Sequence, residues 1–548
     1  MSSSMDIEGA NANYGDTSTD TDGIPLRVYR ETSDKKIAPG HDEKDGNQGE
    51  KEVEQVVQSE HKENQGHELY SVFTVNQKQA MIATGSLASF FSPLSSSIYF
   101  PALGTIAREL NVSVTKIDLT VTTYLIMQGV APMMIAGFSD SMGRRPAYII
   151  CFTIYLAANL GLGLQNSYAA LLVLRCLQSG GSSGTVALAN GLVGDTVTSA
   201  ERGTYIAFAS LGSMLGPSLS PILGGLLSQY LNWHWLFWFL FIFGGVFFVL
   251  LFLFLPETCR KVVGDGSVPP PLLNWSVSDY IRHRRRRKYG IRVDEEKMAE
   301  LRKNYKFQIP NPLPTLMVAL DKETALLLLA TGTGYSCFYA IMTGATTSFQ
   351  EDYKFSNIQV ALMYIPLGAG GILSAFTTGK IVDWNFRRHA HRAGLTVVKN
   401  VRQDLSNFPV ERARLEIALP MFYIGNACII VYGWVMHKKV SLAGPIILMF
   451  VSGFVLNGTS QVLNALMVDL WPGRSAAATA ANNLFRCELG AAASAAIEPM
   501  RKAMGTGLAY TTLGLIMFVS SLSLWLIMWF GLGWRREKNE SRSSGVSA

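Results

Sequence analysis

The sequence predicts an all-α membrane protein with twelve transmembrane helices in two six-helix halves. Of its 548 residues, 48% are hydrophobic and only 16% are charged, a balance typical of a polytopic membrane protein and unlike that of a soluble enzyme. Apolar windows of about 20 residues, the length that crosses a hydrocarbon core of about 30 Å, occur twelve times along the chain. A polar segment over residues 257–320 separates the first six windows from the last six.

The windows set the expected order of the elements. The first six cover residues 80–100, 119–138, 147–165, 169–194, 203–228 and 235–255. The last six cover residues 324–348, 358–382, 415–436, 442–468, 476–499 and 507–533. From these limits we expect a disordered cytosolic tail over 1–72, an N-terminal half over 73–256, a cytosolic central loop over 257–320, a C-terminal half over 321–535 and a cytosolic tail over 536–548.

Positive charge in the connections predicts the orientation of the spans, because cytosolic loops are enriched in Lys and Arg. With both termini cytosolic, Arg144, Arg145 and the basic run 282–288 fall on the cytosolic side. The basic run lies between windows of membrane length, so nucleic acid is not an expected partner. The exceptions, on the outer side, are Arg108, Lys116, Lys438, Lys439, Arg501 and Lys502. We expect the plasma membrane, with the vacuolar membrane as an open alternative.

A polar turn between the second and third windows is the most distinctive stretch of the chain. It runs from Gly137 to Pro146, where Gly143 permits a turn with positive φ and Asp140 can pair with Arg144 or cap a helix. A similar stretch, Gly379–Arg388, follows the eighth window. Such a weak copy in the corresponding place is what duplication of a six-helix unit would leave.

Charged residues inside the windows are expected to face a cavity or a partner, since a charge at the bilayer centre costs about 2.5 kcal/mol or more. Arg175 lies in the fourth window, where its structural alternative is a pairing with Gln178 or a backbone carbonyl. Arg486 and Glu488 lie in the eleventh window, two positions apart and therefore on different helix faces. The alternative for that pair is a helix end whose side chains reach the interface.

These motifs, with Phe100-Pro101 and Leu255-Pro256-Glu257, resemble the fungal twelve-span drug:proton antiporters of the major facilitator superfamily, and most of all the quinidine-resistance-type branch. The resemblance implies the major facilitator fold and proton-coupled export of drugs, toxic organic compounds or secondary metabolites by alternating access. It implies a cytosolic gate latch at Asp140, Gly143, Arg144 and Arg145, a coupling charge at Arg175 and an antiporter motif at Gly216 and Pro217. Arg486 and Glu488 are further gate and coupling candidates, because they are charged residues inside a window.

Aromatic and amide side chains in the windows are the candidates for a substrate cavity, because they bind varied ligands without requiring one charge pattern. They are Tyr124, Gln128, Tyr335, Phe338, Tyr339, Asn457, Gln461, Asn464, Asn482 and Asn483. The expected partners are a small-molecule substrate, protons and the lipid bilayer. We expect a monomer with no metal site and no cofactor, driven by the proton gradient. Asn111, in Asn111-Val-Ser113, is a candidate glycosylation site.

Three alternatives share these features in part. A proton symporter for nutrients or polyamines would use the same fold, and Gly216-Pro217 disfavours it. A non-transporting sensor would be expected to lack the charge of Arg175. An enzyme is excluded because the sequence has no nucleophile elbow, phosphate loop or metal-ligand spacing. The carboxylate that takes the proton is left open among Asp118, Asp195, Glu488 and Glu498.

Overall fold

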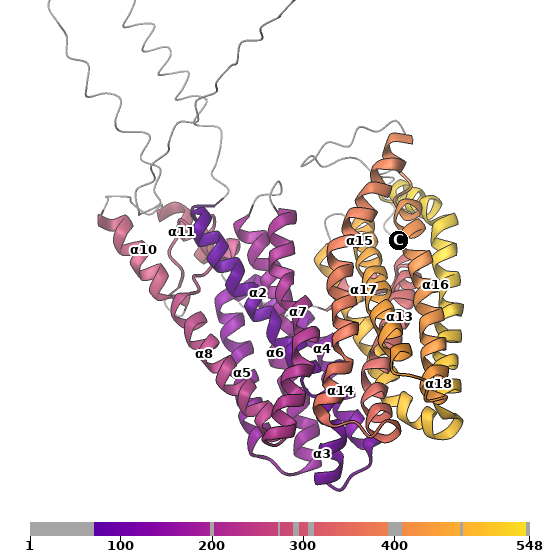
Figure 1. Ribbon diagram of the computed structural model, residues 1–548. Coiled ribbons are helices and arrows are strands. Elements are labelled where there is room, and N and C mark those ends of the chain that lie inside the picture. Colours follow the sequence, from indigo (N-terminus) through magenta and orange to yellow (C-terminus); the bar gives the residue numbers. More distant parts are fainter. Residues whose placement is uncertain are drawn as a thin grey trace, which may run out of the picture.

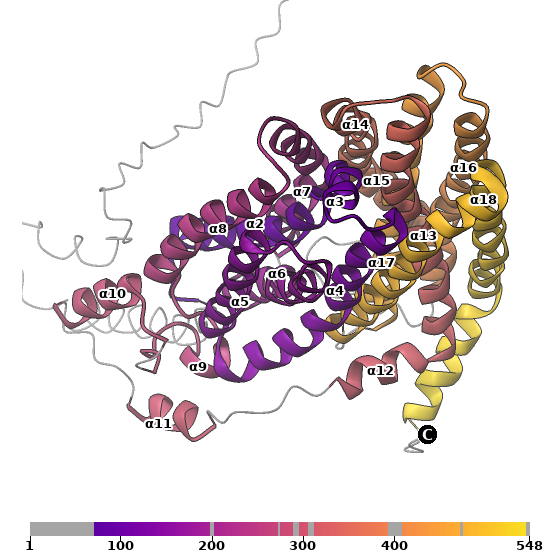
Figure 2. The ribbon, with the colours of Figure 1, turned by 90° about the horizontal axis from the view of Figure 1, so that it is seen from below.

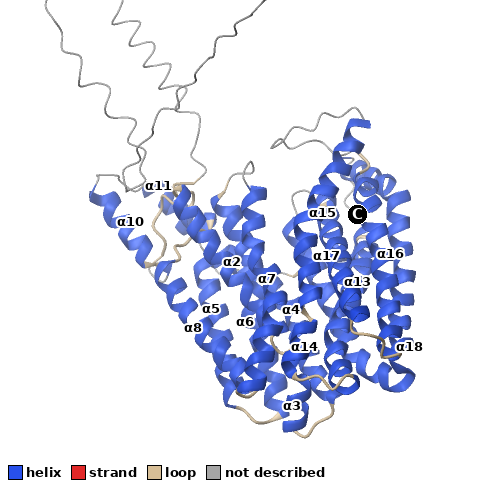
Figure 3. Ribbon diagram, viewed as in Figure 1, coloured by secondary structure: helices blue, strands red, loops and turns tan. Residues whose placement is uncertain are grey.

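The computed structural model describes residues 71–197, 202–271, 274–288, 295–304, 312–392, 408–471 and 475–543. Every regular element in these ranges is a helix (Figure 3). The predicted tail up to residue 70 lies outside them. So do Lys399, Arg402 and Arg474, basic residues between the eighth and ninth and between the tenth and eleventh windows, which the same charge rule predicts to be cytosolic.

The N-terminal half consists of six long helices that overlap the first six predicted windows. They are α2 (Val75–Ser97), α4 (Val114–Met142), α5 (Arg144–Leu164), α6 (Tyr168–Thr196), α7 (Arg202–Tyr230) and α8 (His234–Phe254). The short helices η1 (Phe100–Ala102) and α3 (Leu103–Glu109) join α2 to α4. Helices α2 and α4 are capped by Thr74 and Ser113, whose side chains accept hydrogen bonds from backbone N–H groups of the first turn.

The C-terminal half contains α13 (Lys322–Asp352), α14 (Asn357–Met363), α15 (Ile365–Arg392), α16 (Val410–His437), α17 (Ala443–Leu470) and α18 (Ser475–Ser543). The eighth window is divided between α14 and α15 just before Pro366, which has no N–H to continue the helical hydrogen bonds. The last two windows both lie in α18, where Gly505 has φ 81° and ψ 161° and reverses the chain.

The central segment forms short helices outside the two bundles. These are α9 (Arg260–Val263), α10 (Val277–Lys288), α11 (Glu295–Asn304) and α12 (Leu313–Leu320), and Figure 2 shows the last three at the edge of the molecule. Helix α12 exposes Leu313, Met317 and Leu320 on one face and buries Val318 on the other. Such an apolar exposed face is typical of a helix that lies in the membrane interface.

Eight helices in the described ranges are long and apolar enough to cross a membrane. One of them, Ala477–Lys538, contains two passes separated by Gly505. Helices α2, α6 and α7 supply the remaining passes of the twelve, although their many serines and glycines lower their hydropathy. The serines of α2 illustrate how this is tolerated, because Ser89, Ser92, Ser95 and Ser96 are all buried against neighbouring helices.

The two halves contact each other at one end and diverge toward the other (Figure 1). We call the end with α10, α11 and the C-terminus the upper end, and the end with α3 and α14 the lower end. At the lower end, Thr346 donates to the carbonyl of Phe100 (3.1 Å) and the backbone N–H of Ile358 donates to Gln229 (3.0 Å). Among the described residues, the hydrogen bond between the halves that lies nearest the upper end runs from the side chain of Asn483 to the carbonyl of Gln128 (2.9 Å).

Candidate functional site

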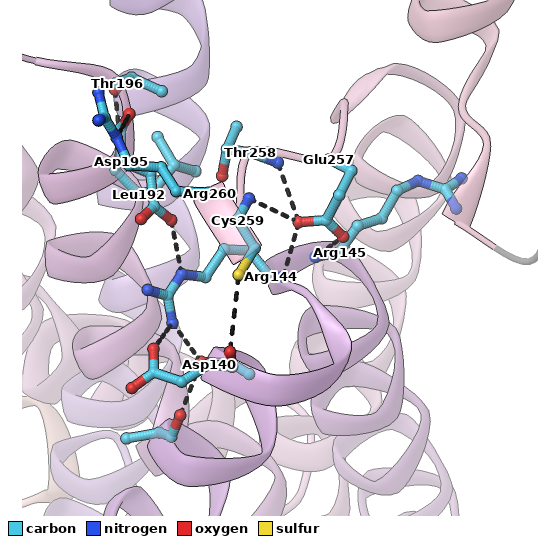
Figure 4. A network of polar contacts seen from close by, with 12 residues as sticks. Asp140, Arg144, Arg145, Leu192, Asp195, Thr196, Glu257, Thr258, Cys259 and Arg260 are labelled. Carbon is cyan, nitrogen blue, oxygen red and sulfur yellow. Dashed lines mark hydrogen bonds and ion pairs between the residues drawn. The ribbon is translucent and has the colours of Figure 1, made fainter. Parts of the chain in front are cut away.

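The predicted turn forms a polar cluster at the upper end of the N-terminal half, which we call the gate cluster: Asp140, Arg144, Asp195 and Glu257 (Figure 4). Helix α4 ends and α5 begins at Gly143, which has φ 114°. The carboxylate of Glu257 occupies the space where a Cβ of residue 143 would lie. Both the backbone conformation and the close approach therefore require glycine at this position.

Arg144 joins the two sides of the gate cluster. Its Nε donates to Asp195 Oδ2 at the end of α6 (2.8 Å), and its Nη1 donates to Asp140 and to Ser139. The side chains of Arg144 and Asp195 are each 11% exposed, whereas that of Asp140 is 54% exposed. The predicted pair with Asp140 is therefore present, but Asp195 is the more strongly desolvated partner.

Glu257 holds the cluster together from the segment after α8. Its Oε1 accepts from the backbone N–H groups of Arg144 (2.8 Å), Thr258 (2.9 Å) and Cys259 (2.9 Å). Its Oε2 accepts from the N–H of Arg145 (3.2 Å) and from the amide of Asn274 (3.4 Å). Burial raises the pKa of Glu257, and the backbone donors oppose that shift. Since only donors face the two oxygens, the site is built for the carboxylate at the N-terminus of α5.

Arg145 has a different role from the predicted latch. Its side chain is buried and donates from Nε to the carbonyl of Leu255 (3.1 Å) and from Nη2 to the carbonyl of Phe252. These are carbonyl groups at the end of α8, which have no partner within the helix. Arg145 therefore fixes the end of α8 against the start of α5.

The C-terminal half has a related contact at residues that the sequence analysis did not single out. Arg414 near the start of α16 binds Asp469 at the end of α17 (3.1 Å), in the same relation as Arg144 and Asp195. The similar stretch Gly379–Arg388 lies inside α15, which continues to Arg392, and its Arg387 donates to the backbone carbonyl of Asp383. The signal that sequence reasoning missed is the aspartate that ends the fourth helix of each half.

Arg175 is fully buried in α6 between the rings of Tyr99 and Tyr124, whose centroids both lie 4.4 Å from Cζ. Its Nη1 donates to the carbonyl of Ser95 (3.0 Å) and to Gln178 Oε1 (2.6 Å). Its Nε and Nη2 find no hydrogen-bond partner among the described residues. The pairing with Gln178 and a carbonyl that we considered is thus present, and it leaves two buried donors unused.

Gly216 and Pro217 lie on α7, where Gly216 is part of a stripe of small residues against α2. A Cβ on Gly216 would lie 2.7 Å from Cγ of Pro93, and one on Gly212 or Gly224 would meet the backbone of α2 directly. This close approach explains the glycines as packing residues.

Arg486 and Glu488 point in different directions from α18, as their spacing predicted. Arg486 Nε and Nη2 donate to Asn483 (3.2 and 2.9 Å), and its Cζ lies 4.9 Å from the ring of Tyr335. Glu488 lies at Gly129 of α4, where its Oε1 has no hydrogen-bond partner among the described residues. Glu488 is therefore an unpaired carboxyl group at the contact between the halves.

The predicted cavity residues divide into two groups in this conformation. Four are buried: Tyr124, Gln128, Tyr339 and Asn482. Six are partly exposed: Tyr335, Phe338, Asn457, Gln461, Asn464 and Asn483. Of the second group, Tyr335, Phe338 and Asn457 line a cavity of about 20 Å³, which is enough for one water molecule.

The four candidate proton carriers also divide into two groups. Asp195 binds Arg144, and Glu498 binds Arg501 (2.7 Å) and Lys502 (3.3 Å). In contrast, neither oxygen of Asp118 nor Oε1 of Glu488 has a hydrogen-bond partner within the described ranges. The pairing of Arg501 and Lys502 with Glu498 also explains how positive charge is accommodated at the lower end.

The candidate glycosylation site Asn111 lies exposed at the lower end, with φ 52°.

Comparison with known proteins identifies the family. The family model described as Major Facilitator Superfamily matches residues 85–495. The chain is 58% identical over 471 residues to "MFS-type transporter phiD" of a fungal species, covering 86% of this chain and 71% of the relative. It is 51% identical over 475 residues to "MFS-type transporter tstD" of Talaromyces stipitatus, covering 87% and 86%.

One more distant relative and one solved structure carry descriptive names. "Citrate exporter 1" of Aspergillus niger is 32% identical over 481 residues, covering 86% of this chain and 89% of the relative. The structure of the human organic anion transporter MFSD10 (TETRAN) has a TM-score of 0.51 at 17% identity, covering 82% of this chain and 99% of that one, and supports the fold alone. With the family model matching most of the chain, this protein belongs to the major facilitator superfamily and is a multi-pass membrane transporter of small molecules.

Proposed function

We propose that this transporter is a proton-coupled exporter of drugs, toxic organic compounds or secondary metabolites, of the fungal drug:proton antiporter type and its quinidine-resistance-type branch. The upper end faces the cytosol, and the lower end faces the exterior or the vacuolar lumen. The protein works as a monomer, in the plasma membrane rather than the vacuolar membrane. The proton gradient supplies the energy, without a further cofactor.

The unequal contact between the halves supports alternating access. The hydrogen bonds from Thr346 and Ile358 join the halves at the lower end, while no ion pair among the described residues connects one half to the other. The gate cluster therefore stiffens the upper end of the N-terminal half without tying it to the C-terminal half. Rocking of the two halves would exchange the closed end for the open one.

The observation that carries the proposal is the unpaired carboxyl group of Glu488 at the contact between α4 and α18. A carboxylate in a membrane-spanning helix needs a cation, a proton or water, because its desolvation is costly. Rocking of the halves changes which end can supply the proton to Glu488. This is the behaviour that coupling requires, and the paired carboxylates Asp195 and Glu498 lack it.

Arg175 supports the same proposal as a fixed charge. Its two unused donors are held in an aromatic enclosure next to α2, and no described carboxylate neutralises the guanidinium. A rearrangement of α2 and α6 during rocking would bring new acceptors to these donors. The name of the citrate exporter among the relatives supports the outward direction of transport.

The test uses purified protein in lipid vesicles, loaded with a compound found by screening a strain that lacks the gene for increased sensitivity. A proton gradient directed opposite to transport should accelerate export by the wild type. Glu488→Gln should export at a rate that no longer responds to the gradient, and Arg175→Ala should not respond either. Asp383→Asn, an exposed acid on α15, is the control. A full response by Glu488→Gln would contradict the proposal.

A further inference from the structure

Two guanidinium groups lie within the spans, and they differ in access. Arg175 is enclosed by two aromatic rings and has no exposed surface. Arg486 is only partly buried, and its Nη1 makes no hydrogen bond within the described part of the chain. No described carboxylate forms an ion pair with Arg486. Of the two guanidinium groups in the described spans, Arg486 is therefore the one available to a ligand.

The surroundings of Arg486 are aromatic and amide side chains of the C-terminal half. The guanidinium lies over the ring of Tyr335, and Phe338 stacks beside Tyr335 with a centroid distance of 6.0 Å and an interplanar angle of 20°. Both rings are partly exposed. They form an apolar surface that begins directly at the charge, which suits a ligand with an apolar body and a charged end.

The nearest acid in the sequence does not neutralise this charge. Glu488 is two positions from Arg486, about 200° around the helix, and lies against Gly129 of α4. On α17, the partly exposed side chains at helical spacing are the amides Asn457, Gln461 and Asn464. Amides offer hydrogen bonds to hydroxyl and carbonyl groups but add no negative charge. The aromatic and amide surroundings of Arg486 in this half therefore leave its positive charge uncompensated, while Glu488 lies on the other side of α18.

We propose that the transported compounds are amphipathic organic acids, with their carboxylate bound by Arg486 and their apolar body resting on Tyr335 and Phe338. This deepens the proposed function and rests on it. A guanidinium binds a carboxylate through parallel hydrogen bonds, a geometry that neither an amide nor an ammonium ligand can reproduce. The proposal removes organic cations from the broad class of exported compounds.

The test measures binding of tritiated naphthaleneacetate to the purified transporter in detergent, by scintillation proximity and without any proton gradient. Naphthaleneacetamide and naphthylethylamine serve as competitors of nearly the same shape, one neutral and one cationic. We expect the wild type to bind the acid about ten-fold or more tightly than the amide, as a charge-assisted pair implies, and the amine more weakly still.

The variants assign the preference to one residue. Arg486→Gln should bind acid and amide equally, while binding of the amide itself is kept and reports an intact fold. Arg486→Lys should keep part of the preference, since it keeps the charge without the planar fork. Arg387→Gln, at an exposed arginine of α15, should behave as wild type. The proposal is overturned if the wild type does not bind the acid, treats acid and amide alike, prefers the amine, or keeps its preference in Arg486→Gln.

This result can be separated from that of the coupling experiment. If the preference for the acid depends on Arg486 but a proton gradient has no effect on export, the substrate class stands and proton coupling fails. If the gradient drives export of cations while naphthaleneacetate does not bind, the coupling stands and the substrate class fails.

Discussion

Replacing Glu257 should destabilise the N-terminal half by an amount that follows from its hydrogen bonds. In Glu257→Gln, the amide oxygen can keep the three short bonds from Arg144, Thr258 and Cys259, while the new NH2 faces the N–H of Arg145. The buried N–H of Arg145 loses its partner, and the amide of Asn274 keeps only its bond to the carbonyl of Met142 (3.1 Å), at a cost of about 2 kcal/mol. Glu257→Ala leaves four backbone donors without the carboxylate, at a cost of about 4 kcal/mol after water enters.

The assay is the apparent melting temperature of detergent-solubilised protein, measured by size-exclusion chromatography after heating. For a unit the size of one half, about 1 kcal/mol corresponds to about 2–4 °C, so Glu257→Gln should melt about 4–8 °C below the wild type and Glu257→Ala lower still. Glu295→Gln, at an exposed acid of α11, is the control and should melt as wild type. Equal melting temperatures for Glu257→Gln and the wild type would refute this account of the carboxylate.

Three further predictions concern the gate cluster, the α2–α7 contact and the central segment. Asp195→Asn should cost about 2–4 kcal/mol of stability and clearly lower the melting temperature. Asp140→Asn should cost less than about 1 kcal/mol, because only the pair of Arg144 with Asp195 is desolvated. The reverse order would show that Asp140 is the main partner of Arg144. Gly216→Ala should cost about 1–3 kcal/mol through contact with Pro93, whereas Gly245→Ala, with open space around it, should be tolerated in the same melting assay. Burial alone would raise the pKa of Asp265, but hydrogen bonds from Ser267 and Lys297 lower it. The stability that this carboxylate contributes is therefore present above about pH 4 and is lost below it as Asp265 is protonated. Spin labels on α9 and α11 should therefore separate only below about pH 4, and separation at neutral pH would contradict the prediction.

The helices and the turn could be predicted because their signals are local. A window of about 20 apolar residues specifies a span by itself, and Gly143 marks the turn by its position between two such windows. The contact of Arg175 with Gln178 could also be predicted, since the two residues lie three positions apart on one helix. The tightness of the α2–α7 contact was open, because glycine and proline suit both close packing and bending.

The partners across the fold could not be predicted. Glu257 binds the backbone of Arg144 over a separation of 113 residues, and no spacing rule connects the two. The same is true of Arg414 and Asp469, which lie 55 residues apart. Arg486 and Glu488 were recognised as charges, but their surroundings depend on α13 and α4, which only the fold brings beside them.

Distances between the halves test alternating access most directly. One pair of spin labels on Ile206 of α7 and Asp383 of α15 reports the upper end, and a second pair on Arg108 of α3 and Leu362 of α14 reports the lower end. All four positions are exposed. We predict that a change of pH or addition of a transported compound shortens the upper distance and lengthens the lower one in the same fraction of molecules. Distances that stay fixed, or that both change in the same direction, would contradict alternating access by rocking of the two halves.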